Sequence, residues 1–260
     1  MSRLAAVVIA AFGCTHGWAQ KQEEHKIDSV PAATQATPRN AGVKPSSVAD
    51  TIAQRTNAFR GREGRDAVTW NRELGAAAQD FAEFMARTGR YGHEADGRQP
   101  SERAVQHGYA YCVVAENIAY RYRSAGFGSD QLAKALVDGW EHSPPHRRNM
   151  LDRDVIDIGV GVAQSTTSDR WYGVQMFGLP QSANIAFRVT NDAAVGVRYR
   201  LGKETFDLLP RVTRSHEQCR PPRLTFSWPT KQPTATVEPH GGDHYVVSRS
   251  ASGAWRLEQQ

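Results

Sequence analysis

The chain has 260 residues, of which 40% are hydrophobic and 23% are charged, and its formal net charge is +5. This length accommodates one large domain or a medium domain with a smaller one, and the composition is that of a globular protein. The mild positive charge favours weak attraction to anionic polymers or membrane surfaces, and it gives no argument for specific nucleic-acid binding.

The N-terminus has the pattern of an export signal. Arg3 precedes an apolar run from Leu4 to Phe12, and the small-residue pattern Gly17-Trp18-Ala19 follows, which predicts a signal peptide over residues 1–19. The run is too short to cross a bilayer, so we expect no transmembrane segment in the mature chain. A lipoprotein site at Cys14 is the alternative, ranked second because the bulky Phe12 lies where such sites take a small residue. We expect a secreted or periplasmic protein, with a lipid anchor as the second form.

Three helices are predicted after a polar stretch. Residues 20–46 are rich in Ala, Thr, Gln and Pro and lack bulky apolar groups, which predicts a disordered linker. Ser46 or Ser47 can then cap a helix that runs to about Arg60. Two further segments, residues 72–87 and a helix beginning at Ser129, carry apolar side chains at helical spacing: Leu74, Ala78, Phe81 and Met85 in the first, and Leu132, Leu136 and Trp140 in the second.

The segment "EHSPPHRRNML" holds His142 and His146 four residues apart, which is the spacing of a metal-binding pair on one helix. Pro144 and Pro145 stand between them, and a proline inside a helix costs roughly 3 kcal/mol. The first helix should therefore end near Ser143, which can cap a second helix that contains His146. A metal site shared by these two histidines is disfavoured.

Short extended runs follow these helices. Residues 157–163 and 170–177 predict two strands, so residues 47–180 read as an α+β domain. Beyond Pro180, β-prone runs alternate with Asn-Asp, Gly-Lys, Pro-Pro and Gly-Gly turn signals, which predicts a small all-β module over 183–260. These runs are 187–189, 195–201, 205–209, 224–228, 245–248 and 255–257.

Polar residues with possible chemical roles recur in an ordered series within the α+β region. "YGHEADGRQPSER" supplies His93 and Glu102, "AENIAY" supplies Glu116, and "GWEHSPPHRRNML" supplies His146. With "TNAFR", "WNRELGAAAQDFA", "GVGVA" and "YGVQMFG" around it, the series resembles the CAP superfamily of cysteine-rich secretory proteins, antigen 5 and pathogenesis-related proteins, and its bacterial SCP-like branch in particular. The resemblance covers about residues 47–180. It implies an α-β-α sandwich with a cleft where two histidines and acidic residues meet.

The resemblance also implies roles for individual residues. His93 matches the first cleft histidine, Glu116 the glutamate of the "GENIA" motif, and His146 the histidine of the bacterial "SPGHR" motif. Ala115 and Pro145 each replace a glycine of those motifs, and both changes should keep the backbone path. The second glutamate of the eukaryotic branch is absent, since Ser143 takes its position, and Glu102 is a further candidate for the cleft.

Such a cleft could bind a metal or a small ligand. Two imidazoles, His93 and His146, can ligate Zn²⁺ or another divalent cation, and a carboxylate can complete the site or orient a histidine. The same three residues, His93, Glu116 and His146, are the candidates for acid–base catalysis. Two simpler roles stay open: Glu116 could accept backbone N–H bonds at a strand–loop junction, and His146 could cap the preceding helix.

These observations favour a binding protein over an enzyme. We expect a secreted, monomeric module whose cleft takes a small ligand or a divalent cation, while the β module attaches to an envelope polymer or a partner. The alternative is a metal-assisted hydrolase acting on an extracellular or cell-wall substrate. Covalent catalysis is disfavoured because no Ser or Cys lies in a recognisable nucleophile elbow.

The cysteines depend on export. If cleavage removes Cys14, Cys112 and Cys219 remain as an even pair in an oxidising compartment. Either they form a disulfide that ties the β module beside the Glu116 motif, or they are two buried free thiols.

Overall fold

The computed structural model describes residues 42–260. The predicted signal peptide, the Cys14 anchor site and most of the predicted linker therefore lie outside the described residues. The separation of 183–260 as an independent module stays a prediction.

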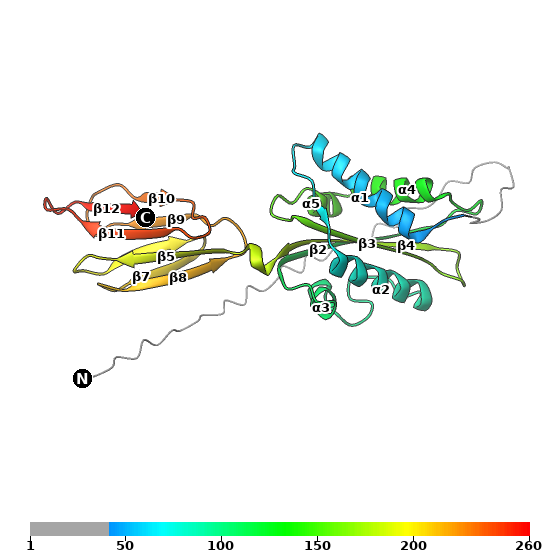
Figure 1. The fold of residues 1–260 in the computed structure, drawn as a ribbon, viewed down its shortest axis with the longest axis horizontal. Helices are drawn as coiled ribbons and strands as arrows, with labels where there is room; N and C mark the ends of the chain where they lie inside the picture. Colours follow the sequence, from blue (N-terminus) through cyan, green and yellow to red (C-terminus); the bar gives the residue numbers. More distant parts are fainter. Residues whose placement is uncertain (1–41) are drawn as a thin grey trace. The chain divides into compact units, whose positions relative to one another are not determined.

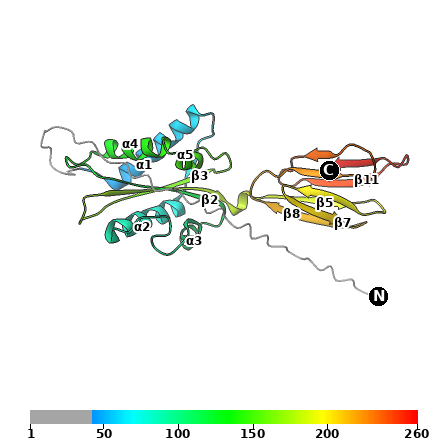
Figure 2. The ribbon, with the colours of Figure 1, turned by 180° about the vertical axis from the view of Figure 1, so that it is seen from behind.

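The first half of the described chain is a sheet with helices on both faces (Figures 1 and 2). The strands lie in the order β1-β3-β4-β2; β1 and β3 are parallel and the other pairs are antiparallel. Helices α1, α4 and α5 cover one face, and α2 and α3 cover the other. The elements are α1 Pro45–Arg62, β1 Thr69–Trp70, α2 Arg72–Thr88, α3 Pro100–Gln106, β2 Tyr111–Arg121, α4 Ser129–Glu141, α5 Pro144–Met150, β3 Asp157–Gln164 and β4 Trp171–Pro180.

The predicted helices are present, with one boundary shifted. Helix α1 begins at Pro45, and its N-cap is Lys44, so the expected cap at Ser46 or Ser47 is wrong. Proline is favoured at the first helical position because its missing N–H is not needed there and its φ already suits a helix. Both serines therefore lie inside the first turn of α1.

The proline break between the two histidines is confirmed. Helix α4 ends at Glu141, Ser143 is the N-cap of α5, and α5 begins at Pro144. His142 lies between them, with its Nδ1 2.7 Å from the carbonyl oxygen of Asp138. His142 is thus tied to the end of α4, whereas His146 belongs to α5.

Two glycines of "GVGVA" explain how closely α2 lies on the sheet. A Cβ at Gly159 would lie 2.2 Å from the backbone of Leu74, and one at Gly161 would lie 2.3 Å from the backbone of Ala78. Any side chain here would push α2 off β3. The close approach seats the buried face of α2, including Phe81, under the site described below.

The remainder of the chain is all-β, as predicted. Two four-stranded sheets, β10-β9-β6-β7 and β12-β11-β5-β8, enclose a core of their own. A 3-10 turn at Gln181–Ala183 leads into strands β5 Ile185–Asn191, β6 Val197–Leu201, β7 Glu204–Leu208, β8 Thr213–Gln218, β9 Leu224–Ser227, β10 Ala235–Val237, β11 His244–Arg249 and β12 Trp255–Gln259. The α+β fold class followed by an all-β region is therefore confirmed.

Covalent and ionic contacts join this region to the preceding one. Cys112, at the start of β2, forms a disulfide with Cys219, and their Cα atoms are 5.2 Å apart. The next residue, Arg220, donates to Asp152 at 2.7 Å and also to Asp154. No helix within residues 42–260 is both long and apolar enough to span a membrane.

Candidate functional site

Strand β2 presents its two faces to different helices. Successive side chains on a strand point to opposite sides of the sheet. Glu116 and Ile118 face the side covered by α2 and α3, whereas Asn117 and Ala119 face the side of α1, α4 and α5. The expectation that Glu116 lies at a strand–loop junction is wrong, because it lies within β2.

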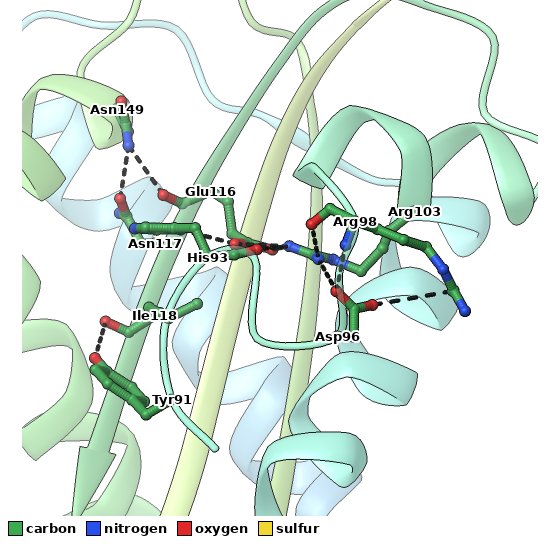
Figure 3. A network of polar contacts seen from close by, with 9 residues as sticks. All are labelled: Tyr91, His93, Asp96, Arg98, Arg103, Glu116, Asn117, Ile118 and Asn149. Atoms are coloured by element: carbon green, nitrogen blue, oxygen red, sulfur yellow. Dashed lines mark hydrogen bonds and ion pairs between the residues drawn. The ribbon is translucent and has the colours of Figure 1, made fainter. Parts of the chain in front are cut away.

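Glu116 is the centre of a charged cluster (Figure 3). Its side chain is 1% exposed, and its Oε1 lies 2.8 Å from Nδ1 of His93. Nη2 of Arg103 donates to both carboxylate oxygens, at 3.0 and 2.8 Å. Both carboxylate oxygens are therefore in contact with the guanidinium, and Oε1 is also in contact with the imidazole.

Arg103 organises the cluster from α3. Its Nη1 donates to the carboxylate of Asp96 and to the carbonyl of Arg98, both at 2.8 Å, and its Nη2 also donates to the carbonyl of His93. The guanidinium lies 3.6 Å from the centre of the Phe81 ring, which is a cation–π contact. Arg103 thereby fixes the loop between α2 and α3, including the backbone of His93.

The charges of this cluster do not cancel. Arg103, Glu116 and Asp96 have side chains at most 8% exposed, and together they carry one positive and two negative charges. Arg98 lies 3.9 Å from Asp96, but its side chain is 49% exposed, so water screens it. The buried part of the cluster thus carries an excess of negative charge beside His93, whose side chain is 30% exposed.

Tyr91 holds the same loop further along β2. Its hydroxyl donates to the carbonyl of Ile118 at 3.2 Å, two residues beyond Glu116 (Figure 3). The loop therefore follows β2 from Glu116 to Ile118, and His93 and Tyr91 are positioned together.

The opposite face of β2 carries a network of neutral amides. Asn117 donates to Gln175 at 2.9 Å and to the carbonyl of His146 at 3.2 Å. Asn149 donates to the Asn117 side chain at 2.9 Å and to the carbonyl of Glu116 at 3.1 Å, and Gln175 donates to Thr56 at 2.7 Å. This network attaches α5 to β2 beside Glu116.

The predicted site residues have different positions. His93 and Glu116 are in direct contact. His146 lies on α5, and its carbonyl joins the amide network. Glu102 is exposed, and its carboxylate accepts from the backbone N–H of Gln99 at 2.7 Å, so the structure uses it to cap α3 and not in the cluster.

Sequence reasoning missed Arg103 and Asp96. In "SER", the arginine beside Glu102 is the buried residue and the glutamate is exposed, the reverse of the sequence-based expectation. Pro100, followed by Glu102, could have placed the start of α3, but neither residue indicates that Arg103 points inward. Asp96 has no comparable signal, because an aspartate in a glycine-rich loop is most often a turn residue.

The donor groups around Glu116 decide whether a metal ion fits there. Within residues 42–260, no three His, Cys, Asp or Glu side chains gather in an arrangement that could hold a metal ion. The Glu116 carboxylate does not fit as a direct ligand, because Arg103 and His93 already occupy its oxygens. His93 does fit, through Nε2, with Glu116 on the other ring nitrogen as in carboxylate–histidine–metal arrangements.

Two hollows of the described surface lie elsewhere. One of about 480 Å³ is lined by residues of β6, β7 and the end of β9, and one of about 290 Å³ is lined by residues of α1, α2 and Trp70. Neither includes His93, Glu116 or His146.

Comparison with known proteins identifies the family. The model of the cysteine-rich secretory protein family, CAP, matches residues 53–177. Residues 53–177 of this chain belong to the CAP family. The predicted resemblance is thus confirmed, and the match contains His93, Glu116 and His146.

Individual relatives match only part of the chain. An uncharacterized membrane protein of Bacillus subtilis, YlbC, is 26% identical over 148 residues, which are 52% of this chain and 39% of that protein. An extracellular SCP-domain protein of Bacillus anthracis is 22% identical, with a TM-score of 0.44, over 52% of this chain and 41% of that one. An outer surface protein of Borrelia burgdorferi is 17% identical, with a TM-score of 0.44, over 50% of this chain and 91% of that one.

Proposed function

We propose that this chain is an exported CAP-domain protein in which His93 binds a small ligand or a divalent cation. The all-β region would attach the protein to an envelope polymer or a partner. The observation that carries the proposal is the 2.8 Å contact between Nδ1 of His93 and Glu116, a carboxylate that Arg103 holds in place.

The orientation of His93 supports binding through its second nitrogen. A carboxylate that accepts a hydrogen bond from Nδ1–H favours the tautomer in which Nε2 carries the lone pair, and that lone pair is what an acceptor or a metal ligand needs. The side chain is 30% exposed, so a ligand can reach it from solvent. The excess negative charge of Arg103, Glu116 and Asp96 favours a cation at that position.

Zn²⁺ is one cation that this arrangement suits. His93 would supply one ligand, His146 is the candidate for a second, and water would fill the remaining positions. A bound divalent ion supplies Lewis acidity and lowers the pKa of its water, which is the basis of the hydrolase alternative. The residues of this chain would orient His93, because Glu116 contacts its Nδ1 and Arg103 holds Glu116.

Export is supported by the disulfide between Cys112 and Cys219. Disulfides persist in secreted and periplasmic proteins and are rare in reducing compartments. The match to a family described as secretory agrees with this location.

Thermal unfolding of the whole chain with increasing Zn²⁺ tests the proposal. A ligand at 100 times its Kd stabilises the folded state by about 2.7 kcal/mol, so the melting temperature of the wild type should rise with metal concentration. His93→Ala should abolish that rise. His142→Ala is the matched control, since this exposed histidine bonds to the end of α4 and lies outside the cluster, and it should keep the wild-type response.

Two results would contradict the cation form of the proposal. One is the same rise in His93→Ala as in the wild type, which would place the metal elsewhere. The other is no rise at any metal concentration, which would restrict the site to organic ligands.

A further inference from the structure

A second surface of the CAP domain combines arginines with aromatic rings. It consists of Phe84 and Arg87 on α2, Arg90 and Tyr91 in the loop after it, Tyr120 on β2, and Arg170 just before β4; we call these six residues the arginine–aromatic strip. Arg87 and Arg90 lie 5.9 and 5.8 Å from the Phe84 ring centre, and Arg170 lies 4.9 Å from that of Tyr120.

The strip is continuous. Arg90 and Tyr91 are chain neighbours, and the rings of Tyr91 and Tyr120 meet edge to face with their centres 5.2 Å apart. Tyr120 pairs with Tyr172 across β2 and β4, which brings Arg170, two residues before Tyr172, to the same edge. Four segments, namely α2, the loop after it, β2 and the residue before β4, therefore contribute to one row of side chains.

The three arginines of the strip are exposed, and none of them forms a salt bridge within residues 42–260. Among residues 42–260, the arginines that form salt bridges are others: Arg55, Arg62, Arg98, Arg103, Arg147, Arg198, Arg211 and Arg220. Arg87, Arg90 and Arg170 instead pack against rings. A ring holds the guanidinium plane and leaves its N–H edge open to an anion.

We propose that the arginine–aromatic strip binds an acidic polysaccharide through its carboxylates. Arginine binds planar carboxylates through two parallel N–H groups, so guanidinium edges held by rings match the repeated carboxylates of a uronic-acid polymer. The arginines come from α2, a loop and the approach to β4, and the strip lines neither of the two hollows described above. This open row suits an extended polymer that contacts successive cations, and it does not suit one small anion.

A membrane surface fits the strip less well. Peripheral membrane binding needs exposed apolar side chains beside the cations. The large exposed hydrophobic residues of the described chain are outside the strip: Trp70, Val105, Tyr111, Tyr122, Ile156, Val195, Leu209 and Val212. The aromatic rings of the strip are themselves half-buried beneath arginines.

Binding of the whole chain to immobilised polygalacturonate tests the proposal. Replacing Arg87, Arg90 and Arg170 together by Ala should weaken binding on the order of tenfold or more, because three exposed charge contacts are lost. The matched control replaces Arg188, Arg200 and Arg256, three exposed arginines of the all-β region, and removes the same charge. That control should bind within about twofold of the wild type.

Additional variants and ligands distinguish the charge of the arginines from the planar geometry of their guanidinium groups, and an acidic polysaccharide from other ligands. Lys at the three strip positions keeps the charge but loses the planar edge, so it should bind more weakly than the wild type. Full retention by the Lys variant, or equal losses in the strip and control variants, would overturn the proposal. Equal binding to neutral dextran would also overturn it, as would binding to phosphatidylglycerol vesicles without binding to polygalacturonate.

Discussion

Two neighbouring residues of β2, Glu116 and Asn117, lie at the centres of different networks. On one face, Glu116 joins Arg103 and His93 through charged groups, and the network reaches solvent at His93. On the other face, Asn117 joins Gln175 and Asn149 through neutral amides, and Asn117 and Gln175 are completely buried.

This difference indicates that the charged network of Glu116 can act as a site, whereas the amide network of Asn117 has a structural role. A charged network with an exposed end can respond to a ligand, because its charge balance changes when a cation or proton arrives. A closed amide network has no titrating group and can only hold its partners in place. Glu116 therefore belongs to the candidate site, whereas Asn117 and Asn149 fix α5 and His146 beside it.

We expect the largest loss of stability from Arg103→Met, which removes the buried cation that Glu116 and Asp96 share. Removing one partner of a buried ionic group typically costs about 3–5 kcal/mol, because Glu116 and Asp96 would remain buried without their cation. Urea unfolding at neutral pH measures this loss. Methionine can keep an apolar contact with Phe81, so the loss reports the charge of the guanidinium together with its hydrogen bonds to the carbonyls of His93 and Arg98.

Two comparisons give that measurement its meaning. Arg98→Met removes an exposed arginine from the same loop region and should cost less than about 1 kcal/mol. The double variant Arg103→Met with Glu116→Leu should be more stable than Arg103→Met alone, since it removes the stranded carboxylate. A loss below about 1 kcal/mol in Arg103→Met would mean that water enters the cluster and that the ion pair is not confining His93.

Asn117→Ala tests the amide face and should have a smaller effect. It leaves Gln175 and Asn149 without one partner each, and an unsatisfied buried polar group costs about 1–3 kcal/mol. Urea unfolding should show the same loss at pH 5 and pH 8, because the network holds no charge. Asn184→Ala, which removes an exposed bond to Glu217, is the matched control. A loss that changed with pH would show that the two faces are coupled.

The sequence predicted the fold well where the pattern was local. The spacing of Leu74, Ala78 and Phe81 indicated α2, and the two prolines indicated the break before α5. Strands β1, β2, β8 and β10 were missed. "TRSHEQ" is almost entirely polar, and its one buried residue, His216, takes its position by pairing with β5, a non-local contact that no local pattern carries.

The site was predictable only in part. His93 and Glu116 were found because their motifs resemble those of a known family, and the structure places them 2.8 Å apart. Arg103 was missed because arginine is normally exposed, and its burial depends on carboxylates that are distant in sequence. Glu102 was misassigned for the related reason that a glutamate beside a candidate site is equally well used as a helix cap.

The smallest expected effect concerns Asp152, just after α5, and it is measured as the change of stability at acid pH. Partial burial raises the pKa of Asp152, but bonds from Arg220 and from the backbone N–H of Asp154 outweigh this, so the pKa is lowered. A lowered pKa in the folded state stabilises above the unfolded value of about 3.9, and this contribution disappears as pH falls through the folded pKa.

Asp152→Asn should therefore lower the free energy of unfolding by about 1 kcal/mol at pH 6, since the ion pair is partly exposed, and by progressively less as pH falls below about 3.9. Urea unfolding at a series of pH values from 6 downward distinguishes the ion pair of Asp152 from the amide hydrogen bonds of Asn117. The difference between wild type and Asp152→Asn should shrink with acidity, whereas the loss from Asn117→Ala should keep one value because amides do not titrate. If the Asp152→Asn difference did not shrink as pH fell, the charge of Asp152 would not be the source of its contribution. The contacts of Asp152 and of Asn117 would then both act as uncharged hydrogen bonds.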